Sequence, residues 1–98
     1  MSDPRYLALL DQMRALHEAK AAGYAGQATD TWTNFREAER WGVSALDGCL
    51  VRMGDKYRRA QNVYTNPANE QVGEALRETL VDLAAYAMIA VCLMDEPR

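Results

Sequence analysis

Apolar residues recur at intervals of three and four along most of this chain, which is the spacing of amphipathic helices. No stretch alternates with the two-residue period of a strand, and no internal repeat or linker interrupts the pattern. The chain is therefore predicted to be a single all-α domain over residues 1–98, a bundle of three long helices and one short helix. The predicted helices run from Asp3 and Pro4 to Ala22 or Gly23, through Trp32 to Trp41, from Ser44 to the break at Thr65-Asn66-Pro67, and from Asn69 to Met94.

Short polar residues and glycines mark the ends of these helices. Residues that can accept a hydrogen bond from the first turn stand at each start, and they are Asp3, Asp30 or Thr31, Ser44 and Asn69. Gly42 is expected to stop the short helix in a left-handed conformation. Gly48 and Gly54 lie inside the third helix, where each lowers helix propensity by about 1 kcal/mol relative to Ala and can permit close approach of a neighbour.

Two surfaces of the last helix are apolar, and one layer of neighbours cannot easily bury both. The expected core residues of the third helix are Leu46, Cys49 or Leu50, Met53, Tyr57 and Ala60. In the last helix they are Leu76, Leu80, Leu83, Ala87 and Val91. A second surface would then consist of Val81, Ala85, Met88, Ile89 and Cys92. We expect it to contact another copy of the chain in a homo-oligomer.

Both tryptophans and the only phenylalanine fall in the short helix. Trp32, Phe35 and Trp41 either anchor this helix to the core or form an aromatic wall that stacks a planar base. His17 lies at the edge of the apolar stripe of the first helix, where a partly buried structural residue is commoner than a ligand.

Composition narrows the class of protein. The net charge of −3 gives no positive field that would hold duplex nucleic acid. The N-terminus lacks the pattern of a signal peptide, and the longest uncharged run, Leu83 to Met94, is too short to span a bilayer. We expect a soluble, cytoplasmic protein in which Cys49 and Cys92 are two buried thiols.

Charged side chains form two stripes that should meet. Carboxylates recur every four residues on one face of the last helix, at Glu74, Glu78 and Asp82, and cations recur on the third helix, at Arg52, Lys56 and Arg59. A short connection predicts antiparallel packing of the two helices, which sets Lys56 and Arg59 opposite the carboxylates. The pattern permits two interpretations. One is an interhelical ion network; the other is a site where carboxylates hold Mg²⁺, Lys56 and Arg59 hold phosphate, and a metal-bound water attacks phosphorus.

Four motifs in order resemble a known family. They are K-x-x-x-Y-x-G at Lys20 to Gly26, N-F-R-x-A-E-R-x-G at Asn34 to Gly42, V-R-M-x-D-K-x-x-R at Val51 to Arg59, and E-T-L-V-D-L-A-A-Y-A at Glu78 to Ala87. Together they resemble the nucleotide-modification-associated domains of the first type, found in small phage and bacterial proteins. That family is similar to the all-α MazG-like nucleoside triphosphate pyrophosphatases.

The resemblance implies an all-α fold that associates into dimers or tetramers around a nucleotide pocket. It also implies Mg²⁺ bound by carboxylates of two adjacent helices and cleavage between the α and β phosphates. Glu78 and Asp82 match the acidic pair of the final motif helix, and Glu74 is the next candidate. The chain departs from the pattern in the preceding helix, where an E-x-x-E pair is missing and Lys56 stands near Asp55 instead.

The resulting hypothesis is a Mg²⁺-dependent hydrolase of a (deoxy)nucleoside phosphate. Its expected metal ligands are Glu78, Asp82 and Asp55, and its expected catalytic residues are Glu74, Glu78 and Asp82. The expected substrate contacts are Lys56 and Arg59 for phosphate and Asn34, Trp32 or Tyr86 for the base. The alternatives are a nucleotide-binding protein without catalysis and a helical interaction protein.

Overall fold

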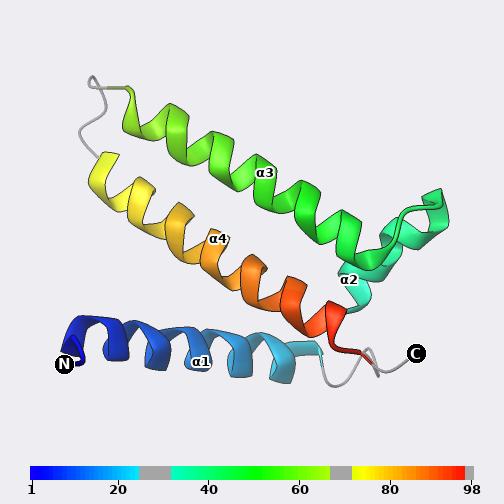
Figure 1. Cartoon of the computed structure of the whole chain (residues 1–98), viewed down its shortest axis with the longest axis horizontal. Coiled ribbons are helices and arrows are strands. Elements are labelled where there is room, and N and C mark those ends of the chain that lie inside the picture. The colour runs from blue at the N-terminus through cyan, green and yellow to red at the C-terminus, as the bar shows by residue number, and fades with distance from the viewer. Residues whose placement is uncertain (25–31, 67–71, 97–98) are drawn as a thin grey trace. The chain divides into compact units, whose positions relative to one another are not determined.

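The computed structural model describes residues 1–24, 32–66 and 72–96, and every regular element among them is a helix (Figure 1). The all-α prediction is therefore confirmed. The chain divides into two compact units, Met1–Thr33 and Asn34–Arg98, which are described separately below. Organisation as a single domain stays a prediction. Among the described residues, no helix has the length and apolarity needed to cross a membrane.

The first unit contains α1, Pro4–Tyr24. Asp3 is its N-cap, as predicted, because Oδ1 of Asp3 accepts a hydrogen bond of 2.8 Å from the backbone N–H of Arg5. The Arg5 guanidinium also lies 2.7 Å from Oδ2 of Asp3. This pairing lowers the pKa of the Asp3 carboxyl below its ordinary value.

The second unit begins with the short helix, which has two parts. It is α-helical in α2, Thr33–Arg36, and tightens to a 3₁₀ helix in η1, Glu37–Trp41. Gly42 ends it with φ of 76°, as predicted. Phe35 is buried, but Trp41 is 84% exposed, so of the two interpretations of the aromatic residues, anchoring to the core does not hold for Trp41. The caps proposed at residues 30 and 31 lie outside the described residues.

The third helix, α3, spans Ala45–Tyr64 and begins at the predicted N-cap. Oγ of Ser44 accepts a 3.0 Å hydrogen bond from the N–H of Asp47. The helix buries Ala45, Cys49 and Ala60. The prediction of Cys49 or Leu50 for the core is confirmed for Cys49, and that of Ala60 is confirmed as well. Tyr57 was also predicted for the core, yet it is 57% exposed.

The last helix, α4, spans Val72–Met94; its proposed cap at residue 69 lies outside the described residues. Thr79, Ala90 and Leu93 are buried. Oγ1 of Thr79 donates a 2.8 Å hydrogen bond to the carbonyl oxygen of Ala75, so the buried hydroxyl is satisfied. Leu80 and Val91 were predicted core residues but are 48% and 55% exposed, because the smaller residues that precede them, Thr79 and Ala90, are buried instead.

Helices α3 and α4 form an antiparallel hairpin, as predicted (Figure 1). Two contacts give its register: the Cys49 thiol donates to the Tyr86 carbonyl at 3.3 Å, and Lys56 Nζ lies 3.3 Å from Asp82 Oδ2. The 3₁₀ helix η1 packs against the start of α3. Gly48 permits this contact, because a Cβ there would lie 3.0 Å from Cβ of Ala38.

The hairpin carries different residues on its two sides. Successive residues of a helix are turned by about 100°, so the residues before and after a buried position lie on opposite flanks. Helices α3 and α4 run antiparallel. In both helices, the residue that follows a buried position therefore lies on the same side of the pair, and the residue that precedes it lies on the other side. On the side of the residues that precede buried positions lie Arg52, Arg59, Glu78 and Asp82, and further along α4 also Ile89 and Cys92. These four charged residues, with the half-buried Lys56, are called the polar face. The exposed apolar residues on the other side are called the apolar face and are Leu50, Tyr57, Tyr64, Leu80, Val91 and Met94; Gln61 interrupts them on α3.

Candidate functional site

The polar face is centred on the ion pair between Lys56 of α3 and Asp82 of α4. The two side chains are 30% and 50% exposed, and the 3.3 Å contact joins the predicted cationic and acidic stripes. A pair this accessible to water contributes about 0–1 kcal/mol to stability. The pair therefore leaves both groups available to a ligand at little energetic cost.

The remaining charged candidates flank this pair without contacting it. Glu78 lies one turn before Asp82 on α4, and Arg59 lies about one turn after Lys56 on α3. Glu74 lies one turn further along α4, and Asp55 is adjacent to Lys56. All four are exposed, and within the described part of the chain none of them forms an ion pair. In the antiparallel register, Glu78 of α4 and Arg59 of α3 lie at about the same position along the length of the hairpin.

The predicted metal ligands are oxygen donors of the kind that Mg²⁺ prefers. However, the described residues contain no group of three or more His, Cys, Asp or Glu side chains that could hold a metal ion. Asp82 is already neutralised by Lys56 at 3.3 Å. The Mg²⁺ site therefore stays a prediction.

A pocket of about 230 Å³ opens where η1 crosses the start of α3. Its lining combines an exposed indole, an amide, a carboxylate and a guanidinium, and consists of Asn34, Phe35, Glu37, Ala38, Trp41, Gly48 and Arg52. Cζ of Arg52 lies 5.3 Å from the centre of the Phe35 ring, so a cation–π contact holds the guanidinium at the pocket.

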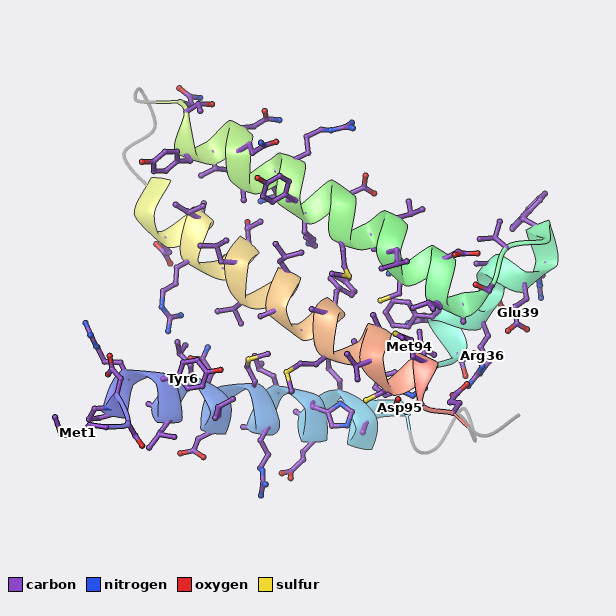
Figure 2. All side chains as sticks on the ribbon, viewed as in Figure 1. Met1, Tyr6, Arg36, Glu39, Met94 and Asp95 are labelled. Carbon is purple, nitrogen blue, oxygen red and sulfur yellow. The ribbon has the colours of Figure 1, made fainter. Side chains whose placement is uncertain are left out.

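Contacts with α4 hold the wall of this pocket in place. Phe35 packs edge-on against Tyr86, with ring centres 5.9 Å apart. Arg36 forms an ion pair with Glu96, beyond the end of α4. Its guanidinium also lies 4.0 Å from the carboxylate of Glu39; Arg36 and Glu39 are labelled in Figure 2. These contacts tie α2 and η1 to the C-terminal end of α4. The pocket wall formed by α2 and η1 therefore depends on contacts with the C-terminal part of the second unit.

The residues proposed to contact the base lie in different surroundings. Asn34 lines the pocket. Tyr86 does not line the pocket, but its ring packs edge-on against Phe35, which does. Trp32 belongs to the first unit, where its ring stacks on His17 with centres 5.7 Å apart and 28° between the planes. The roles proposed for Trp32 and Tyr86 stay predictions.

Sequence analysis did not assign Glu37, Trp41 and Arg52 to one pocket. The sequence did indicate that Trp41 lies at an exposed helix end, because charged residues precede it and Gly42 follows it. No sequence pattern indicates that Arg52 lies over Phe35, because the two residues come from different elements. Only the packing of α2 and η1 against α3 brings them together.

The two cysteines differ from each other. Cys49 is completely buried, as expected, but Cys92 is exposed, so the prediction of two buried thiols is wrong for Cys92. Burial raises the pKa of the Cys49 thiol, and the positive charge of Arg52 acts weakly in the opposite direction. A thiol of this kind is a core residue and not a nucleophile.

Comparison with known proteins found no matching family model, no matching curated protein and no matching solved structure.

Proposed function

We propose that this chain binds a nucleoside phosphate, with the base in the pocket beside Trp41 and the phosphates along the cations of α3. The observation that carries the proposal is the position of Arg52. This residue lines the pocket and also precedes Lys56 by one helical turn, so it joins the pocket to the cationic row of the polar face.

The groups of the pocket suit a planar, hydrogen-bonding ligand. The exposed indole of Trp41 offers a stacking surface, and the amide of Asn34 can both donate to and accept from a base edge. A phosphate chain leaving the pocket along α3 would meet Arg52, then Lys56 and Arg59. Guanidinium and ammonium groups are the usual partners of phosphate oxygens.

Hydrolysis assisted by Mg²⁺ is the further part of this proposal. It is favoured by Glu78 and Asp82, which share one face of α4 beside the expected phosphate position. Phosphate oxygens of the nucleotide would have to complete the ligand set, as is common for Mg²⁺. Binding without catalysis is the alternative, because Lys56 already neutralises Asp82.

Binding is tested by titrating nucleoside triphosphates into the protein with calorimetry. We expect Arg52→Ala to weaken binding about tenfold, which corresponds to the loss of one charge-assisted contact worth about 1.4 kcal/mol. Arg58→Ala removes the same charge from an exposed position of α3 outside the polar face and serves as the control. Equal loss in both variants would mean that only net charge matters, and absence of binding to the wild type would overturn the proposal.

Hydrolysis is tested by incubating the protein with nucleoside triphosphates and Mg²⁺ and measuring released pyrophosphate and phosphate. Glu78→Gln and Asp82→Asn are expected to abolish turnover while nucleotide binding without Mg²⁺ persists. Glu18→Gln, an exposed substitution in α1, is the control and should keep full activity. Turnover that survives in both α4 variants would remove these carboxylates from the reaction. Binding without any product would leave the non-catalytic alternative.

A further inference from the structure

The pocket beside Trp41 contains a carboxylate that the binding of phosphate does not require. Glu37 lines this pocket together with Asn34 and Trp41. The three residues follow one another at intervals of three and four positions along α2 and η1, so they share one face of the short helix. A base stacked on the indole of Trp41 would therefore present an edge to the side chains of Asn34 and Glu37.

The Glu37 carboxylate is held in place by a neighbour but stays accessible. Nε of Arg40 lies 3.2 Å from Oε2 of Glu37, three residues earlier on η1, and the two side chains are 75% and 55% exposed. An ionised carboxylate donates no hydrogen bond and has about four sites that accept one. The pair with Arg40 therefore leaves Glu37 able to accept from a ligand that brings two donors.

The volume of the pocket limits what it can enclose. At about 230 Å³ it is smaller than the roughly 300–1,000 Å³ of pockets that surround a whole small molecule. It therefore suits one ring system, with the sugar and the phosphates outside. Phe35, Ala38 and Gly48 give the pocket an apolar lining that any base can contact. Discrimination between bases has to come from the polar side chains.

We propose that the carboxylate of Glu37 selects guanine, so that the ligand of this pocket is a guanine nucleotide. Guanine carries two adjacent donors, N1–H and the 2-amino group, whose parallel N–H bonds match the two oxygens of a carboxylate. The side-chain amide of Asn34 can donate to O6 on the same edge. This inference rests on the proposed binding of a nucleoside phosphate and adds the identity of its base.

The other bases fit a carboxylate less well. Adenine and cytosine have one donor beside a ring nitrogen that accepts, so one carboxylate oxygen would face a lone pair. Uracil and thymine place their one donor between two carbonyl oxygens, which a carboxylate repels. Glu37 thus favours guanine by attraction and disfavours the other bases by repulsion.

The choice of ligand provides a test that needs no variant. Inosine triphosphate lacks only the 2-amino group of guanosine triphosphate, and adenosine triphosphate presents one donor beside an acceptor. In calorimetry with the wild type, we expect guanosine triphosphate to bind about tenfold more tightly than adenosine triphosphate, with inosine triphosphate between them. Equal affinities for the three ligands would overturn the assignment of guanine.

Two carboxylates of η1 provide matched variants. Glu37 and Glu39 are 55% and 56% exposed, and each lies within 4.0 Å of an arginine three residues away, Arg40 and Arg36 respectively. Glu37 lines the pocket and Glu39 does not. Glu37→Gln turns one acceptor into a donor, so we expect guanosine triphosphate to bind about tenfold more weakly and adenosine triphosphate to lose nothing. Glu39→Gln should keep the preference. A preference that survives Glu37→Gln, or is lost equally in Glu39→Gln, contradicts the proposal.

Failure of this inference can be told apart from failure of nucleotide binding. Arg52→Ala should weaken all three triphosphates by the same factor, because Arg52 is proposed to act on the phosphates that they share. Binding that depends on Arg52 but ignores the base overturns only the assignment of guanine. Absence of binding of all three triphosphates to the wild type overturns both proposals.

Discussion

At the scale of single residues, Cys49 is the most completely enclosed side chain among the described residues. It lies in the contact between α3 and α4, where its thiol donates to the Tyr86 carbonyl at 3.3 Å. The neutral thiol fits this position and a thiolate does not, which is why burial raises its pKa. Its reactivity therefore reports on the closure of the hairpin.

We expect a thiol reagent to modify Cys92 rapidly and Cys49 only as fast as the hairpin opens. Absorbance assays on Cys49→Ala and Cys92→Ala, each with one remaining thiol, measure the two rates. Addition of denaturant should make the rates equal. Rapid modification of Cys49 in the folded protein would contradict its burial.

The raised pKa of Cys49 also predicts how stability changes with pH. The thiol stays protonated in the folded chain at a pH where the unfolded chain ionises, near pH 8.5 for an ordinary cysteine. Its contribution is therefore complete below that pH and is lost as pH rises toward the folded pKa. Urea unfolding of Cys49→Ala should show a smaller loss of stability at alkaline pH than that of Cys92→Ala.

At the scale of elements, the two glycines within α3, Gly48 and Gly54, differ in the space around them. A Cβ on Gly54 would meet nothing within 4 Å, whereas a Cβ on Gly48 would lie 3.0 Å from Ala38 of η1. Gly54 therefore only lowers helix propensity, while Gly48 allows η1 to lie close to α3 and form the pocket.

Gly54→Ala is expected to raise the free energy of unfolding by up to about 1 kcal/mol, because alanine is the better helix former. In Gly48→Ala the same gain is outweighed by overpacking against η1, which typically costs about 1–3 kcal/mol, so we expect a net loss of about 1 kcal/mol. Urea denaturation of the two variants measures both effects. Equal stabilisation in both would mean that η1 can move away from α3 freely.

At the scale of the whole molecule, the interior of the second unit is small. Apart from Phe35 and Leu93, the buried residues that the structure describes there are small or medium-sized, and they are Ala45, Cys49, Ala60, Thr79 and Ala90. Small residues let α3 and α4 approach closely, but they bury little apolar area. The second unit is therefore stabilised by close contact between α3 and α4 over a small apolar area.

The all-α class of the fold and several helix ends could be predicted from the amino-acid sequence. Asp3, Ser44 and Gly42 act within a few residues of their own positions, so their roles can be recognised without knowledge of the fold. The antiparallel pairing of α3 and α4 and the meeting of Lys56 with Asp82 followed from a short connection and charge spacing.

Which flank of each helix is buried, and where the aromatic residues lie, could not be predicted from the sequence and depends on how the helices pack. Both α3 and α4 have apolar residues on more than one flank, and a shift of one residue turns a helix by about 100°. Leu50, Leu80 and Val91 are exposed because smaller neighbours make the closer contact, and Trp41 is exposed because η1 ends at the surface. Periodicity shows that a helix has an apolar side, but the shape of the neighbouring element selects the residues that it buries.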